Sequence, residues 1–321
     1  MRILVWHLHG SWTTSFVQGP HEYIIPVTPG RGPYGLGRAA TWDWPASVAE
    51  VSPGELPSAR ADVIVLQRPT EFRLVRNWLG QTPGTDVPAV YVEHDPPPLP
   101  GVRTRHPMAG TPGLRIVHVT HFNARHWDCG TSPTSVVEHG IADPGARWTG
   151  ELERAGVVIN DPIRRGRTAG TDLLPGFAQA APLDVFGMRV TGLASALGMA
   201  PGRCAEFEDL PQHRMLAELA RRRVYVHPFR WTSLGLSLIE AMQLSMPVVV
   251  FAATEAPVAV SQEAGYVSDD PIALQAALRR LMRDPVAAAE TGASARQAAC
   301  ERYGLKRFLD DWNQVLAEAR Q

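Results

Sequence analysis

Short apolar segments alternate with segments of helical periodicity along most of the chain. Many apolar segments are continuous runs of Val, Ile and Leu, which is typical of strands buried on both faces of a sheet. A first series of predicted strands comprises Arg2–Trp6, Tyr23–Val27, Asp62–Leu66, Ala89–Glu93, Arg115–Thr120 and Ser135–Glu138. A second series comprises Gly156–Ile159, Leu183–Phe186, Cys204–Phe207, Val224–His227, Val248–Phe251 and Gly265–Val267. Helical patterns lie between them, for example over Pro211–Arg222, Leu234–Leu244 and Pro271–Arg283. This alternation predicts parallel, doubly wound α/β sheets.

A turn-rich segment from His139 to Gly145, followed by polar residues up to Arg154, separates the two series. At 321 residues the chain is long for a single hydrophobic core. We therefore predict two Rossmann-like domains that face a cleft, with limits at 1–142 and 143–321. The last helical segments, roughly Pro285–Gln321, follow the second sheet, and the final helix is able to pack back on the N-terminal domain.

Composition narrows the possible partners. The formal net charge is -1, so the chain has no global basic field that would attract nucleic acid. No stretch reaches the roughly 20 apolar residues that a membrane span needs, and the apolar N-terminus is too short for a signal peptide. The cysteines are odd in number and widely separated, at Cys129, Cys204 and Cys300. This spacing argues against disulfides and structural zinc and favours a cytoplasmic location; the oligomeric state is not constrained.

The residues from Val224 to Met242 have the pattern of a strand, a short loop and a helix. The helix is expected to begin near Ser233, with Thr232 or Ser233 as its N-cap. Backbone N–H groups around Ser233–Leu236, including that of Leu234, would then combine with the helix dipole to form a phosphate site. Gly235 would allow the phosphate to approach the backbone closely.

Glu240 lies about two turns into this helix. A carboxylate behind a phosphate-binding helix start can accept hydrogen bonds from a ribose diol, whereas the alternative is a solvated helix charge. The whole string from His227-Pro228 through Leu234-Gly235-Leu236 and Glu240-Ala241-Met242 to Pro247-Val248-Val249 resembles the donor site of GT-B glycosyltransferases. The resemblance is strongest to the retaining family 4 (group 1) and covers roughly residues 155–285. Thr232 stands where that family has its first glutamate, beside the sugar, so the sugar is not identified.

A second part of the resemblance is a basic motif after the first strand of the C-terminal domain. Arg164 stands at the position of the family's arginine, and Ala169 takes that of its lysine, in a chain whose only lysine is Lys306. Arg165 or Arg167 is then expected to supply the second cation, because a guanidinium group binds phosphate through paired hydrogen bonds. Solvated loop arginines are the alternative. By the same resemblance, the turn at Leu210 lies where the nucleobase is read.

The N-terminal domain offers candidates for the acceptor. Gly10-Ser11 replaces the paired glycines of the family, in a loop that approaches the donor phosphate or the acceptor. His9 and Trp12 are candidate acceptor-binding residues, with plain packing as the alternative. His7 and His9 would provide only two ligands and no acidic partner, so no metal is expected.

Two more histidines follow predicted strands. The resemblance implies that His94, at the start of a proline-rich loop, faces the sugar or acceptor, although a buried, merely hydrogen-bonded histidine is the alternative. His121 ends the next strand and is expected to complete the acceptor wall. His139-Gly140 resembles the family's hinge sequence and is interpreted first as hinge geometry.

The resemblance implies a metal-independent, retaining transfer of a sugar from a nucleoside diphosphate sugar to a small-molecule or glycan acceptor, without a cofactor. In this hypothesis Arg164 stabilises the leaving diphosphate, Glu240 holds the ribose and His94 orients the sugar or acceptor. The alternatives are a GT-B epimerase or phosphorylase, or a non-catalytic sugar-nucleotide-binding subunit. The sequence does not identify the base, the sugar or the acceptor.

Overall fold

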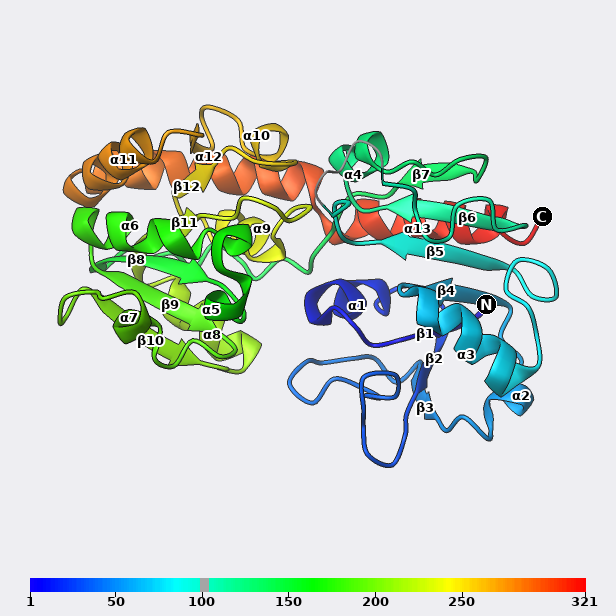
Figure 1. Cartoon of the computed structure of the whole chain (residues 1–321). Helices are drawn as coiled ribbons and strands as arrows, with labels where there is room; N and C mark the ends of the chain where they lie inside the picture. The colour runs from blue at the N-terminus through cyan, green and yellow to red at the C-terminus, as the bar shows by residue number, and fades with distance from the viewer. Residues whose placement is uncertain (99–103) are drawn as a thin grey trace. The chain divides into compact units, whose positions relative to one another are not determined.

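The computed structural model describes residues 1–98 and 104–321 (Figure 1). The chain divides into two compact units: unit 1 comprises Met1–Ile141 and Leu305–Gln321, and unit 2 comprises Ala142–Gly304. The boundary lies one residue before the predicted one, and the last helix, α13 (Leu305–Glu318), belongs to unit 1.

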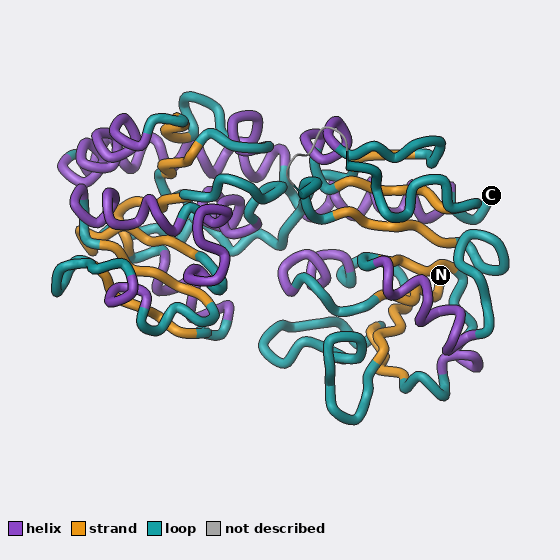
Figure 2. The backbone as a smooth tube through the Cα atoms, in the orientation of Figure 1, coloured by secondary structure: helices purple, strands orange, loops and turns teal. Residues whose placement is uncertain are grey.

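Unit 1 is built on a parallel sheet of seven strands with the order β3-β2-β1-β4-β5-β6-β7. Figure 2 draws the strands in orange and the helices in purple. The strands are β1 (Arg2–Val5), β2 (Glu22–Pro26), β3 (Val48–Val51), β4 (Val63–Leu66), β5 (Ala89–Glu93), β6 (Leu114–His118) and β7 (Thr134–Val136). Besides α13, the helices are α1 (Gly10–Phe16), α2 (Leu56–Ala59), α3 (Pro69–Leu79) and α4 (His121–His126). The sequence analysis missed β3, because this edge strand buries only its first residue and contains the polar Glu50.

Helix α13 packs its apolar face on α1. The Trp312 ring lies 5.7 Å from the ring of Trp12 and 5.2 Å from that of Phe16, centroid to centroid. The ring of Phe308 lies 6.2 Å from Trp12. These aromatic contacts explain why the final segment of the chain folds with unit 1.

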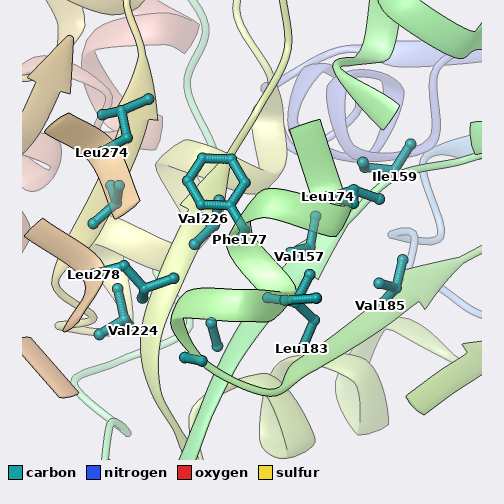
Figure 3. Close-up of a cluster of buried hydrophobic side chains, with 14 of the residues drawn as sticks. Val157, Ile159, Leu174, Phe177, Leu183, Val185, Val224, Val226, Leu274 and Leu278 are labelled. Carbon is teal, nitrogen blue, oxygen red and sulfur yellow. The ribbon is translucent and has the colours of Figure 1, made fainter. Parts of the chain in front are cut away.

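Unit 2 contains a parallel sheet of six strands with the order β10-β9-β8-β11-β12-β13. The strands are β8 (Leu152–Val158), β9 (Leu183–Gly187), β10 (Cys204–Glu208), β11 (Arg222–His227), β12 (Val248–Phe251) and β13 (Gly265–Ser268). The α-helices are α5 (Pro162–Arg165), α6 (Leu174–Ala180), α7 (Leu193–Ala196), α8 (Gln212–Leu219), α9 (Leu236–Gln243), α10 (Ala256–Ala259), α11 (Pro271–Arg283) and α12 (Pro285–Arg302). Figure 3 shows Phe177 of α6 and Leu274 and Leu278 of α11 packed among strand valines. The two sheets confirm the predicted doubly wound α/β class.

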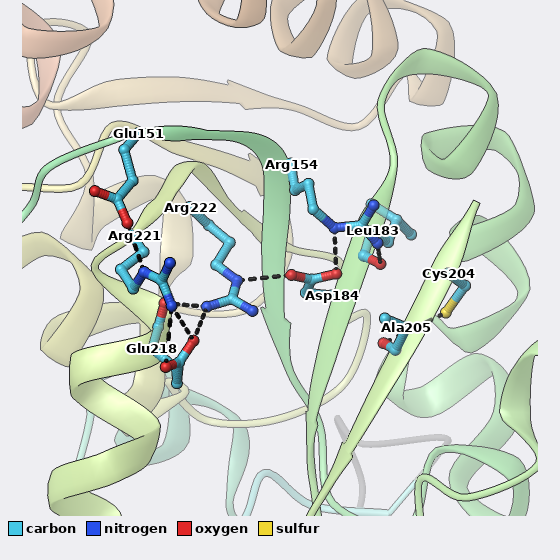
Figure 4. A network of polar contacts seen from close by, with 9 residues as sticks. All are labelled: Glu151, Arg154, Leu183, Asp184, Cys204, Ala205, Glu218, Arg221 and Arg222. Carbon is cyan, nitrogen blue, oxygen red and sulfur yellow. Dashed lines mark hydrogen bonds and ion pairs between the residues drawn. The ribbon is translucent and has the colours of Figure 1, made fainter. Parts of the chain in front are cut away.

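A buried ionic network at the amino ends of the strands of unit 2 explains two wrong boundaries (Figure 4). Asp184 of β9 accepts hydrogen bonds from Arg154 of β8 and, at 2.7 Å, from Arg222 of β11. The Arg222 guanidinium also lies 4.9 Å from the ring centroid of Phe207. Arg154 and Arg222 are therefore paired inside strands, whereas the sequence had placed Arg154 in the polar linker and Arg222 at a helix end.

In the described part of the chain, no helix combines the length and the apolar character that crossing a bilayer requires.

Candidate functional site

The strand order of unit 2 reverses between β8 and β11, and open α/β sheets bind ligands outside the carboxyl ends of strands at such a switch point. The two loops that follow these strands are joined there. The carbonyl of Thr168 accepts hydrogen bonds from the backbone N–H groups of Arg230 (3.1 Å) and Trp231 (3.0 Å). Gly170 has a φ of +71°, and a Cβ atom there would lie 1.8 Å from the carbonyl oxygen of Pro228. Only glycine fits at this contact.

Helix α9 begins at Leu236 with Gly235 as its N-cap and no side-chain cap, so the prediction of Thr232 or Ser233 as the N-cap was wrong. The Ser233 carbonyl accepts hydrogen bonds from Thr254 Oγ1 (3.1 Å) and the Glu255 N–H (3.4 Å), both of which follow β12. These contacts hold residues 232–234 in the loop and delay the helix. Ser233 and Leu234 are buried, whereas Thr232 and Leu236 remain partly exposed.

His227 lies directly behind Gly235. A Cβ at residue 235 would meet the imidazole Cε1 at 2.4 Å, so the glycine lets the loop lie against the ring. Burial lowers the pKa of His227 to about 3, with a further contribution from the charge of Arg165. The imidazole is therefore neutral at physiological pH. The Phe229 ring lies 4.7 Å from the imidazole and 5.2 Å from the Arg165 guanidinium carbon, which places Arg165 over an aromatic face.

Glu240 is 6% exposed, so it is not the solvated helix charge that the sequence allowed as an alternative. Its Oε1 atom accepts a 2.9 Å hydrogen bond from Nε2 of Gln212, the first residue of α8. Gln212 follows the turn that contains Leu210. In this turn the backbone N–H of Asp209 donates to the carbonyl of Gly187, the last residue of β9, at 3.0 Å. The turn predicted to read the base is thus joined through α8 to the predicted ribose carboxylate.

The arginines of the site are arranged around two aspartates. Asp161 Oδ2 contacts both Arg164 and Arg189, the latter at 2.8 Å. The hydrogen bond from Arg164, supported by that from Arg189, lowers the pKa of Asp161. Asp172 holds Arg167, at 3.0 Å, and Arg230 in the same way.

The predicted cations Arg164 and Arg167 have side chains that are 72% and 77% exposed, so they are open to a ligand. The sequence analysis missed Arg189 and Arg230, since neither stands in the basic motif and both arrive through other loops.

In unit 1, His9 and His94 come together at the carboxyl edge of the sheet, their ring centroids 4.1 Å apart. His94 Nε2 donates to Oε1 of Gln67 (2.9 Å), whose Nε2 donates to the Trp6 carbonyl (2.7 Å). Burial, followed by the charges of His9 and His139, lowers the pKa of His94 well below its usual value. A neutral imidazole that donates from Nε2 presents Nδ1 as an acceptor.

The other predicted acceptor residues are placed less favourably. Trp12 is 1% exposed and packs in the aromatic cluster with α13, which is the packing alternative left open by the sequence. Gly10 and Ser11 form the first turn of α1 instead of a loop. His121 is exposed at the start of α4. His7 Nδ1 pairs with the Gly37 carbonyl at 3.0 Å, and the described residues contain no cluster of three candidate metal ligands.

Comparisons with known proteins agree with this architecture. Residues 206–299, which lie within unit 2, match the family model described as glycosyl transferases group 1. A comparison with curated protein sequences found no match.

Several solved structures share the fold at low identity. Sucrose-phosphate synthase from Thermosynechococcus elongatus superposes with a TM-score of 0.72 at 13% identity, over 99% of this chain and 98% of that one. HepE from Anabaena, in complex with UDP and glucose, gives a TM-score of 0.69 at 14% identity, over 99% and 100%. TarM gives 0.62 at 16% identity, and the match covers 79% of this chain but only 54% of TarM.

The likeness to these solved structures shows the GT-B fold, and the match to the glycosyl transferases group 1 model is confined to residues 206–299. The matched family model is the group 1 model that the Glu240 motif predicted. Assignment to the retaining family 4 remains a prediction.

Proposed function

We propose that the chain transfers a sugar from a nucleoside diphosphate sugar bound by unit 2 to a small-molecule or glycan acceptor. The observation that carries this proposal is the buried Glu240 carboxylate, which lies behind the start of α9 next to the switch point of the sheet. Burying a carboxylate is costly unless it accepts hydrogen bonds, and the two hydroxyl groups of a ribose would provide them at this position.

The leaving diphosphate would be stabilised by arginines instead of a metal. Arg164, Arg165 and Arg167 lie at the end of β8, and α9 presents its uncapped amino end from the neighbouring strand β11. Positive charges and amide dipoles that are already in place stabilise negative charge as it develops on the leaving group. With no metal required, the reaction would be independent of cofactors, and the family resemblance favours retention of configuration.

The acceptor would bind unit 1, where the ring centroids of His9 and His94 lie 4.1 Å apart. His94, held by Gln67 through Nε2, would orient the sugar or acceptor. We also propose His121 for acceptor binding and a cytoplasmic location for the chain.

A thermal-shift panel of UDP, GDP, ADP and TDP tests the donor assignment, since a ligand that binds the native state raises its melting temperature. UDP is the first probe because HepE and a TarM variant were both solved with it. We expect one diphosphate to raise the melting temperature in a concentration-dependent manner. If none does so, the proposed function is wrong.

Turnover is then measured with the corresponding sugar nucleotides and a panel of acceptors, with and without a chelator. The expected product is a glycosylated acceptor in the presence of the chelator. Epimerisation of the donor in the absence of acceptor would instead show an epimerase on the same site.

A further inference from the structure

Asp161 and Arg189 face each other where the loops after β8 and β9 meet. Both are non-glycine residues with left-handed backbones, at φ values of +54° and +57°. The loops are joined by a hydrogen bond from the Asp161 N–H to the Met188 carbonyl (2.7 Å) and one from the Met188 N–H to Asn160 Oδ1 (2.9 Å). Left-handed conformations in non-glycine residues cost energy and concentrate at functional sites.

Two carboxylates of β10 hold the Arg189 loop in this conformation. Glu208 accepts hydrogen bonds from the backbone N–H groups of Arg189 (2.5 Å), Val190 (2.9 Å) and Thr191 (3.0 Å). Glu206 accepts two more, from residues 192 and 194, each at 2.7 Å. Five backbone hydrogen bonds thus hold the loop on the carboxylates of β10, the edge strand of the sheet.

Two arginine side chains of this pair of loops converge on one carboxylate. Arg189 and Arg164 share a single carboxylate oxygen, Asp161 Oδ2, so two guanidinium groups face one negative charge. The side chain of Arg189 is 76% exposed. An incoming phosphate can therefore bind both guanidinium groups from the solvent side while Asp161 keeps them oriented.

We propose that Arg189 is a second phosphate-binding residue of the donor site, acting beside Arg164 with Asp161 as their positioning residue. This inference rests on the proposed function and extends it to a residue outside the basic motif. The loop after β9 would thereby contribute to the diphosphate site between the β8 arginines and the base-reading turn after β10.

Titration calorimetry with UDP, GDP, ADP and TDP tests the proposal on the full chain. Arg189→Ala should lower the affinity for the diphosphate that wild type binds by about tenfold, which corresponds to the loss of one charge-assisted hydrogen bond. The loss should shrink as salt is raised. Arg283→Ala, at the exposed end of α11, is the matched control and should bind like wild type.

Asp161→Asn separates a phosphate ligand from a mere clip between loops. This variant weakens the ion pair between the loops, but it keeps both guanidinium groups and an amide oxygen that can still orient them. Because it also removes the negative charge that competes with the phosphate, it should bind the diphosphate at least as tightly as wild type. An equal loss in Asp161→Asn and Arg189→Ala would overturn the proposal in favour of a clip. Unchanged binding in Arg189→Ala would also overturn it while leaving the proposed function intact, whereas absence of diphosphate binding in wild type would refute both.

Discussion

The assignment of Glu240 to the ribose can be tested by removing its charge without changing its shape. In Glu240→Gln the side-chain oxygen can still accept the hydrogen bond from Gln212, which is 2.9 Å long in the structure. The change therefore isolates the ionic part of any ribose contact. Because burying a charge costs more than burying an amide, the free energy of unfolding should not fall.

The expected loss of affinity in Glu240→Gln follows from the two ribose hydroxyl groups that would donate hydrogen bonds to the carboxylate. Hydrogen bonds to charged groups contribute about 1 kcal/mol more than neutral ones, so two of them contribute about 2 kcal/mol, or roughly 30-fold in affinity. Calorimetry with ribonucleoside diphosphates and their 2′-deoxy forms measures this loss directly. Wild type should lose roughly tenfold on removal of the 2′-hydroxyl, and the Glu240→Gln variant clearly less.

The decisive quantity is the coupling energy between Glu240 and the ribose 2′-hydroxyl, which is obtained by removing each of them singly and then both. If the 2′-deoxy penalty is the same in wild type and Glu240→Gln, the carboxylate does not contact the ribose and its assignment fails. Glu290→Gln, which changes an exposed carboxylate on α12, controls for general effects of charge.

Three further results are expected. Asp184→Asn should lower the free energy of unfolding in urea by about 3 kcal/mol, the low end for breaking a buried ion pair, because the buried Arg222 loses one of its two carboxylate partners and keeps Glu218. Glu153→Gln, whose side chain is 77% exposed, should cost less than about 1 kcal/mol, and equal effects would refute the buried network. Gly170→Ala should weaken diphosphate binding at least about tenfold, as judged from contacts to charged groups, since its Cβ meets the facing carbonyl of the β11 loop; Gly198→Ala has a similar φ of +61° but open space, and should bind normally. The folded pKa of His227, about 3, lies below the unfolded value, so its contribution to stability is complete above about pH 6.5 and is lost as pH falls towards 3. Urea unfolding of His227→Gln between pH 6 and 4 should show a slope smaller by about 1.4 kcal/mol per pH unit, and an unchanged slope would contradict a buried neutral imidazole.

The strands of both sheets were readable from the sequence wherever burial on two faces selected an unbroken apolar run. Val63–Leu66 and Val248–Phe251 are of this kind. Strands that carry polar side chains were not predicted in full, as in β3 with Glu50 and at the start of β8 with Arg154. In β8 the arginine is accepted inside the sheet because Asp184 of the neighbouring strand neutralises it. A prediction made from one segment at a time does not include Asp184, which lies in a different strand.

The site shows the same division between local and tertiary information. Glu240 and Gly235 could be predicted as site residues because both belong to one strand-loop-helix unit whose sequence carries the family resemblance. Gln212 and Arg189 reach the site through strand adjacency, since the order β10-β9-β8-β11 brings the ends of β9 and β10 beside that of β8. The left-handed backbone of Arg189 depends on Glu208, nineteen positions away in the sequence. The sequence around Arg189 does not reveal this contact. Because the chain has a single lysine, its composition predicted that arginines would bind the diphosphate, but it could not identify the strands that supply them.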